Sequence, residues 1–278
     1  MSIGSKIYQK RKLLEMTQNQ LSEAVGVSFQ AVSAWERDEY LPDTQKLLDI
    51  AKVLGTTVAF LLDEDIADVP NWGLRDRAFS EEHMYTFVKA TATAKSLNGT
   101  LRALPFAKDK HKDQFRKGKD YVPYINHPLT ITCHALAMGI QDDDVLAAIL
   151  LHDVVEDCQV TLDELPANDK VKDIVDRVSK AELPGEERSV FKKRYHARIM
   201  ENSAASLVKI MDRCNNLSMM ATGFDRDKMI TYIVETEEYV FPLIEKLKDT
   251  EPQYSNALFL IKYQMLSVMG TAKRLLAK

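Results

Sequence analysis

The chain has 278 residues, of which 45% are hydrophobic and 28% are charged, a composition typical of folded proteins. This length exceeds the usual size of one domain, so two domains are expected. No apolar run is long enough to cross a bilayer, and the start, MSIGSKIYQKRKLL, lacks the apolar core of a signal peptide. Three cysteines without CxxC spacing argue against a disulfide framework. We therefore expect a cytoplasmic protein that contacts no membrane.

The formal net charge of −4 provides no general attraction to polyanions. Up to Leu62, seven Lys or Arg residues stand against seven Asp or Glu residues. Any nucleic-acid binding must therefore come from a local surface.

The first 62 residues contain short helical patterns separated by turn signals. Thr17 can cap a helix through QNQLSEAV, Gly26 can end it, and Ser28 can cap the next helix, FQAVSAWER. Apolar residues repeat at helical spacing there and in a further helix from Thr44 to Leu54. The region is predicted to be a compact module of about five helices.

The order TQNQLSEAVGVSFQAVSAWERDEYLPDTQKLLDIAKVLG resembles the helix-turn-helix domain of the phage-repressor and Cro-like family over roughly residues 3–62. The resemblance implies that the second helix of the motif enters the major groove of double-stranded DNA, with Gln30 as the best candidate to read a base. One such helix per chain favours a homodimer. The alternative is a docking or dimerisation module, because the recognition helix begins without Lys or Arg. The DNA-binding candidates are Gln18, Ser28, Phe29, Gln30 and Ser33.

Composition changes after this module, where DEDIADVPN is acidic and ends in Pro and Asn. Longer helical patterns follow, and segments with strand-like alternation are scarce. The predicted fold class is all-α, with a small five-helix domain and a larger multi-helix domain. We assign residues 1–66 to the helix-turn-helix domain, 67–79 to a linker and 80–278 to the second domain.

The stretch LHDVVEDCQV sets His152, Asp153, Glu156 and Asp157 at the end of an otherwise apolar helix. On one continuous helix, His152 lies one turn from Glu156, and Asp153 lies one turn from Asp157. Several carboxylates at the edge of a core are costly unless a cation compensates them. The alternative is a solvated helix end.

Two distant stretches favour the cation. His127 precedes Pro128 at the expected start of a helix in YVPYINHPLT, and Asp212 follows an apolar run in LVKIMDRCNNL. Together with His152 and Asp153 they form a mixed nitrogen and oxygen set, which suits manganese, iron or zinc better than calcium.

Four motifs in order, HKDQFRKGKDYVPYINHP, LAAILLHDVVEDCQVTLDEL, VDRVSK and LVKIMDRCNNL, resemble the HD-domain metal-dependent phosphohydrolases, in the branch shared with the hydrolase half of the RelA/SpoT alarmone enzymes. The resemblance covers roughly residues 80–278. It implies the metal ligands His127, His152, Asp153 and Asp212, with Mn²⁺ the first choice and Fe²⁺ or Zn²⁺ as alternatives. It also implies that Glu156 and Asp157 orient or deprotonate the attacking water, and that Arg116, Tyr124 and Asn216 contact a nucleotide substrate.

The resemblance implies hydrolysis of the 3′-diphosphate of a guanosine alarmone. Cys214 and Asn215 replace a Leu-His pair common in the family, and the segment from Arg116 to His127 is about two residues longer than usual. Another nucleotide substrate therefore stays open, as does a transcriptional regulator whose HD domain senses a nucleotide without turnover. The basic neighbours of His196, in KKRYHARIM, allow a place near the pocket, but we interpret it as part of a solvated basic face.

Overall fold

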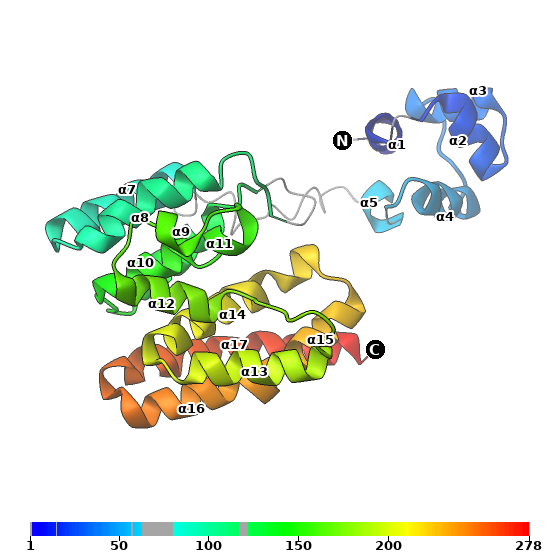
Figure 1. Cartoon of the computed structure of the whole chain (residues 1–278). Coiled ribbons are helices and arrows are strands. Elements are labelled where there is room, and N and C mark those ends of the chain that lie inside the picture. The colour runs from blue at the N-terminus through cyan, green and yellow to red at the C-terminus, as the bar shows by residue number, and fades with distance from the viewer. Residues whose placement is uncertain (1, 15, 57, 63–79, 117–121, 278) are drawn as a thin grey trace. The chain divides into compact units, whose positions relative to one another are not determined.

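The computed structural model describes residues 2–14, 16–56, 58–62, 80–116 and 122–277. The chain divides into two compact units, Met1–Arg75 and Asp76–Lys278. Over the described residues both units are helical, and the one extended pairing is an isolated antiparallel bridge between Phe115 and Pro123 (Figure 1). The all-α prediction is confirmed. The predicted linker, 67–79, lies outside the described residues. None of the described helices is long and apolar enough to cross a membrane.

The first unit contains the predicted helices. They are α1 (Ile3–Leu13), α2 (Gln18–Val25), α3 (Phe29–Glu36), α4 (Thr44–Val53) and α5 (Val58–Leu62). Thr17 caps α2 through a capping box with Gln20, and Gly26 ends that helix in the left-handed conformation at φ 65°. Ser28 caps α3 by accepting a hydrogen bond from the Ala31 backbone N–H. The predicted helix, turn and helix are confirmed.

A buried ion pair links the first helix of this unit to the third. The Arg11 guanidinium donates to both carboxylate oxygens of Glu36, and each side chain is only 4% exposed. Gln18 Nε2 donates to the same carboxylate at 2.7 Å. This network joins α1, the start of α2 and the end of α3, so it holds the two helices of the motif in their relative orientation.

The second unit is a larger bundle. Its α-helices are α7 (Glu81–Ala94), α8 (Asn98–Lys110), α9 (Asn126–Ala137), α10 (Asp143–Leu151), α11 (Val154–Asp157), α12 (Asp169–Val178), α13 (Arg188–Met200), α14 (Ser203–Gly223), α15 (Arg226–Glu235), α16 (Phe241–Thr250) and α17 (Ser255–Leu276). The 3-10 helices η2 (Leu162–Glu164) and η4 (Pro252–Tyr254) and the π-helical segment η3 (Thr236–Val240) connect some of them.

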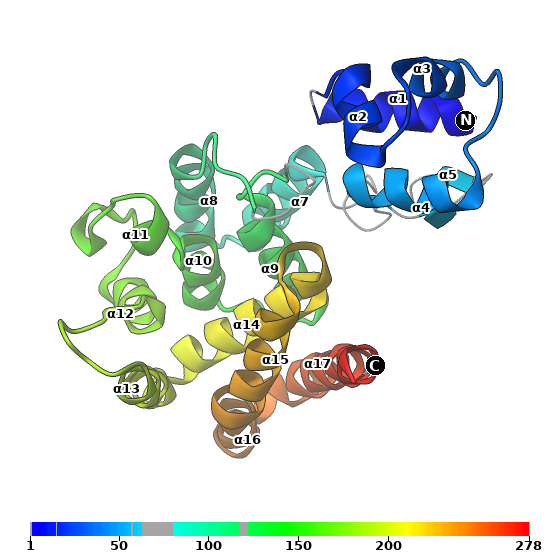
Figure 2. The ribbon, with the colours of Figure 1, turned by 90° about the vertical axis from the view of Figure 1, so that its right-hand side faces the viewer.

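Helix α10 lies at the centre of this bundle. It packs against α8, α9, α12 and α14 (Figure 2), and every residue from Val145 to Leu151 is buried. A helix that is apolar on all sides is expected where neighbouring helices surround it. The residues that follow α10 therefore lie at the edge of the core, close to α9 and α14.

The helix does not continue through the motif that follows. α10 ends at Leu151, and the short helix α11 begins at Val154. His152 Nδ1 lies 2.8 Å from the Ile149 carbonyl oxygen, which an unbroken helix would offer to the Asp153 N–H. The expectation that His152, Asp153, Glu156 and Asp157 continue the apolar helix is therefore wrong, because the helix is interrupted at His152 and Asp153, where an imidazole takes up this carbonyl.

Candidate metal centre and cavity

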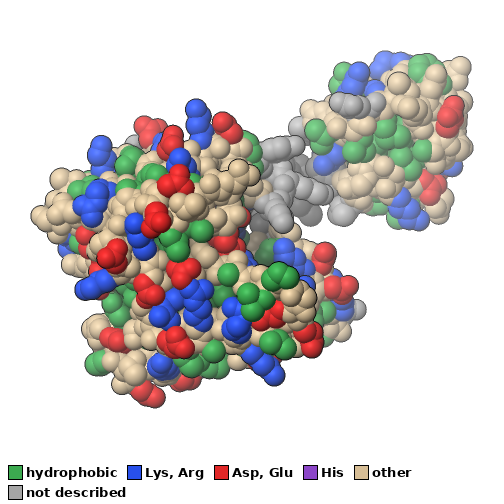
Figure 3. Space-filling view, viewed as in Figure 1, with side chains coloured by type: hydrophobic (Ala, Val, Ile, Leu, Met, Phe, Trp, Pro, Cys, Tyr) green, Lys and Arg blue, Asp and Glu red, His purple; other side chains and the backbone are tan. Residues whose placement is uncertain are grey.

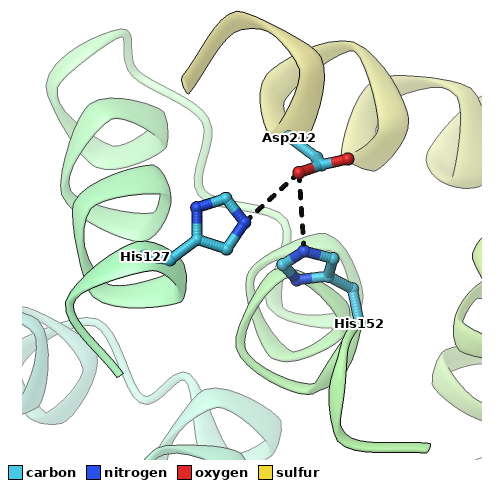
Figure 4. A group of neighbouring side chains, drawn as sticks. All are labelled: His127, His152 and Asp212. Atoms are coloured by element: carbon cyan, nitrogen blue, oxygen red, sulfur yellow. Dashed lines mark ion pairs between the residues drawn. The ribbon is translucent and has the colours of Figure 1, made fainter. Parts of the chain in front are cut away.

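Four predicted ligands meet where α9, the break after α10 and the middle of α14 converge. Asp212 Oδ1 lies 3.2 Å from His127 Nε2 and 3.8 Å from His152 Nε2, as Figure 4 shows. Asp153 Oδ2 lies 3.1 Å from His152 Nε2 and 3.6 Å from His127 Nε2. Ligand atoms of His127, His152 and Asp212 all lie within 4.8 Å of one another. The set named from the sequence is thus brought together in space.

The hydrogen bonds of this cluster fit a divalent transition-metal ion. The Nδ1 atoms of His127 and His152 lie 2.8 Å from the Asn215 Oδ1 and the Ile149 carbonyl oxygen, so both act as donors there. Each Nε2 atom then faces carboxylate oxygens, and the buried Nε2 of His152 has no hydrogen-bond partner among the described residues. A divalent cation could take the place of a proton between these nitrogen and oxygen atoms, because imidazole and carboxylate groups are suitable ligands for manganese, iron and zinc.

Burial and charge also favour a cation here. Burial alone would raise the pKa of Asp212, but Lys209 and the two imidazoles hold it well below its ordinary value. Burial would lower the pKa of His152, but Asp153 and Asp212 raise it to about 10. Burial dominates at His127 and lowers its pKa. The cluster thus keeps both carboxylates ionised and attracts positive charge.

The two carboxylates are held from outside the cluster. Lys209, one turn before Asp212 on α14, places Nζ 3.0 Å from Asp212 Oδ2, and both side chains are 10% exposed. Asn216 Nδ2 donates to Asp212 Oδ1 at 2.5 Å. The Tyr124 hydroxyl donates to Asp153 Oδ2 at 2.6 Å. These contacts restrict the carboxylates to the orientations that face the imidazoles.

The predicted substrate-contacting residues lie on one side of the cluster. Two backbone hydrogen bonds, from Arg116 N to Val122 O and from Tyr124 N to Gln114 O, hold Arg116 near Tyr124. The Arg116 guanidinium lies 5.7 Å from the centre of the Tyr124 ring and donates to Asn216 Oδ1 at 2.8 Å. Arg116, Tyr124 and Asn216 are therefore neighbours.

The acidic pair on α11 divides into two environments. Glu156 accepts hydrogen bonds from the backbone N–H and the ammonium of Lys180, at 2.6 and 2.8 Å. Asp157 is exposed, and no described Lys or Arg forms an ion pair with it. Both residues line the same cavity as the ligand cluster. Glu156 is therefore held in place, whereas the Asp157 carboxylate is free of a cationic partner in the described part of the chain.

This cavity has a volume of about 360 Å³ and combines the ligand cluster with basic side chains. Three basic residues pair with carboxylates: Lys180 with Glu156, Lys209 with Asp212, and Arg213 with Glu235 at 3.9 Å. Three others, Arg116, Arg188 and Lys228, form no ion pair with a described carboxylate. The space-filling view shows basic and acidic side chains interspersed over the visible face of this unit (Figure 3).

In the first unit, the candidate DNA contacts differ in their availability. Ser28, Phe29 and Gln30 are exposed at the start of α3, with Phe29 44% exposed. Ser33 is half-buried and accepts a hydrogen bond from Arg37. Gln18 is half-buried and donates to Glu36.

Several residues that shape the cavity were not predicted. Lys209 could have been inferred from its position one turn before Asp212, where opposite charges pair on a helix. Asn215 was noted only as a departure from the family pattern, although its amide contacts His127. The interpretation of His196 as solvated is wrong, because that side chain is 6% exposed and its ring stacks on Tyr239 at 4.6 Å. The remaining residues not foreseen in the cavity wall are Val178, Lys180, Arg188, Val208, Arg213, Lys228, Thr231, Tyr232 and Glu235.

Comparisons with known proteins match both units. A family model described as an HD domain matches residues 103–230, and one described as a helix-turn-helix matches residues 7–61. A solved structure described as a metazoan ortholog of SpoT that hydrolyses ppGpp has a TM-score of 0.50 at 24% identity, covering 62% of this chain and 94% of that chain. This likeness shows a shared fold.

Two kinds of relative are similar in sequence. The guanosine-3′,5′-bis(diphosphate) 3′-pyrophosphohydrolase MESH1 of Mus musculus is 35% identical over 170 residues, covering 57% of this chain and 89% of MESH1. The protein of the same activity from Aquifex aeolicus is 31% identical over 151 residues, which make up 52% of this chain and 21% of that protein. Since most of MESH1 is matched at this identity, the chain belongs to the same family of HD-domain proteins as MESH1, and it carries a helix-turn-helix domain in addition.

Proposed function

We propose that the HD domain is a metal-dependent phosphohydrolase that removes the 3′-diphosphate of a guanosine 3′,5′-bis(diphosphate). The observation that carries the proposal is the cluster of His127, His152, Asp153 and Asp212 in the wall of a cavity that basic residues also line. Membership in the MESH1 family supports the choice of substrate, because MESH1 is named as a guanosine-3′,5′-bis(diphosphate) 3′-pyrophosphohydrolase. Mn²⁺ is the proposed metal, with Fe²⁺ or Zn²⁺ as alternatives.

The reaction would use the side chains of the cavity in distinct roles. A divalent cation held by His127, His152, Asp153 and Asp212 would lower the pKa of a water molecule toward 7 and would neutralise charge on phosphate. Asp157 accepts a proton from the water, whose oxygen forms a bond to the phosphorus attached to the ribose 3′ oxygen. The bond between that phosphorus and the 3′ oxygen breaks, the 3′ oxygen takes a proton from solvent, and pyrophosphate leaves. Glu156, held by Lys180, orients the water from the other side.

The unpaired cations favour a substrate with more than one phosphate group. Arg116, Arg188 and Lys228 have no carboxylate partner among the described residues, and they line the same cavity as the ligand cluster. The cluster serves the phosphate that reacts, so these side chains are available to a second anionic group such as a 5′-diphosphate. Arg116 can also stack on a base, because a guanidinium plane packs on aromatic rings.

A panel of nucleotides incubated with the full chain and Mn²⁺, with products separated by ion-exchange chromatography, tests the activity. Release of pyrophosphate from guanosine 3′,5′-bis(diphosphate) is expected, and Asp153→Asn should abolish it. An unchanged substrate would refute the proposal for this nucleotide. If another nucleotide is hydrolysed instead, the substrate is wrong but the phosphohydrolase stands.

The role of the unpaired cations has its own test. Arg188→Gln should raise KM for the bis(diphosphate) several-fold and leave KM unchanged for guanosine 3′-diphosphate, which has no 5′ phosphates. Lys193→Gln is the matched control, because Lys193 is exposed on the same helix and does not line the cavity. An equal change for both substrates would count against a 5′-phosphate contact.

The helix-turn-helix unit adds a second proposed function, binding of double-stranded DNA by a homodimer. The exposed Phe29 and Gln30 at the start of α3 favour direct contact with bases. A binding selection with random DNA should enrich a site with two half-sites about one helical turn apart. Loss of the selected sequence in Gln30→Ala would support this. If Asp153→Asn lacks turnover yet nucleotides still change DNA affinity, the two domains communicate through binding alone.

A further inference from the structure

One contact in the cluster comes from a residue that is not itself a ligand. Asn215 lies on α14 one turn after Asp212 and is 6% exposed. Its Oδ1 atom lies 2.8 Å from His127 Nδ1. An amide oxygen is only an acceptor, so this contact requires a proton on Nδ1. Nε2 of His127 is thereby left with a lone pair.

The other neighbours of His127 favour a proton on its other ring nitrogen, Nε2. Nε2 faces Asp212 Oδ1 at 3.2 Å and Asp153 Oδ2 at 3.6 Å, and both carboxylates are acceptors. Without a cation they favour a proton on Nε2, which would donate to Asp212 and remove the lone pair that a metal needs. The carboxylates and Asn215 therefore compete over which nitrogen of His127 carries the proton.

His152 faces the same carboxylates through Nε2, at 3.1 Å from Asp153 and 3.8 Å from Asp212, but its Nδ1 partner is not a side chain. Its Nδ1 atom contacts a backbone carbonyl, that of Ile149, at 2.8 Å. The Nδ1 partner of His152 is a backbone carbonyl, which no substitution removes, whereas the Nδ1 partner of His127 is the side-chain amide of Asn215, which can be substituted.

We propose that Asn215 is a positioning residue that holds His127 in the Nδ1–H tautomer and so presents Nε2 to the metal. The inference rests on the proposed function, because it takes the cluster to be a metal site. Asn215 would act through His127, since it does not line the cavity itself. Partners of this kind affect metal affinity roughly 10- to 100-fold.

Two substitutions separate this role from simple packing. Asn215→Leu keeps the approximate size of the side chain and removes the acceptor, so we expect the affinity for Mn²⁺, measured by titration calorimetry on the full chain, to fall roughly 10- to 100-fold. Asn215→Asp keeps an acceptor oxygen at the same place and should retain affinity within about threefold of the wild type, well below the loss expected for the leucine variant. Asn256→Leu, at an exposed position on α17, is the control for the leucine substitution.

A second measurement does not depend on metal binding. In the metal-free protein labelled with ¹⁵N-histidine, long-range proton–nitrogen NMR should find the proton of His127 on Nδ1 in the wild type and on Nε2 in Asn215→Leu. Equal Mn²⁺ affinity in the wild type and Asn215→Leu, with an unchanged tautomer, would overturn the inference. If the wild type binds no Mn²⁺, the proposed function fails, but the tautomer still reports on Asn215. If Asn215→Leu does not fold, retained affinity and tautomer in Asn215→Asp support the role, and a shift to Nε2 in that variant overturns it.

Discussion

The ion pair between Lys209 and Asp212 yields a prediction whose size can be worked from the structure. The two side chains are 3.0 Å apart and each is 10% exposed, so water screens them little. Removing one partner from a buried pair costs about 3–5 kcal/mol, because the other charge is left uncompensated. Since Asp212 keeps its hydrogen bond from Asn216, we expect Lys209→Met to fall at the lower end, about 3 kcal/mol.

Differential scanning calorimetry of the full chain measures this loss. For a unit of this size, each kcal/mol lowers Tm by about 2–4 °C, so the transition of the HD domain should fall by about 6–12 °C. The transition of the helix-turn-helix unit should not move. The matched control is Lys248→Met, whose pair with Glu245 has the same spacing along the helix but side chains 35% and 53% exposed. An exposed pair contributes about 0–1 kcal/mol, so this variant should lose little.

Metal provides a further check on the cause. A cation in the cluster supplies positive charge near Asp212 when Lys209 cannot, so saturating Mn²⁺ should raise Tm more in Lys209→Met than in the wild type. The reasoning is refuted if Lys209→Met and Lys248→Met lose equal stability, because burial of the pair would then have no energetic consequence.

Three other predictions concern single contacts. Glu36→Gln leaves Arg11 buried without its anion and should lower the stability of the helix-turn-helix unit by about 3 kcal/mol in denaturant titrations; an unchanged midpoint would contradict this. Thr17→Ala removes the cap of α2 and should cost about 1 kcal/mol in the same assay. Burial lowers the pKa of His196 to about 4. Its unfolded form therefore binds the proton first on acidification, and stability is lost between about pH 6.5 and pH 4. His196→Phe keeps the stacking on Tyr239 and should reduce this acid loss by up to about 3 kcal/mol; parallel pH curves for both proteins would rule out His196 as the source.

The parts of the structure that could be predicted are those that depend on residues close together in the sequence. Thr17, Gly26 and Ser28 mark helix ends by the chemistry of their own side chains or backbone, so α2 and α3 were found with their caps. His152 and Asp153 stand out because an apolar helix ends in ionisable groups. Ligand chemistry suggested grouping them with His127 and Asp212, and the family resemblance implied the same four residues, but spacing along the chain does not reveal which distant helices meet.

What could not be predicted depends on the rotation of helices and on tertiary contacts. Asn215 and Asn216 are adjacent on α14, yet one contacts His127 and the other contacts Arg116. His196 stands among Lys and Arg in sequence, but its own ring points into the bundle against Tyr239. A basic neighbourhood along the chain describes the helix surface as a whole and does not say which face a single residue occupies.

At the break between α10 and α11, His152 has a second role, which is to hydrogen-bond a backbone carbonyl group. Its imidazole satisfies the Ile149 carbonyl at the buried end of α10, so an alanine at this position would remove a ligand and also leave a carbonyl group without a partner in the core. Amide hydrogen exchange should then accelerate along the last turn of α10 even in metal-free protein. Loss of activity in such a variant would mix coordination with local unfolding, whereas a substitution at Asn215 leaves the end of that helix intact.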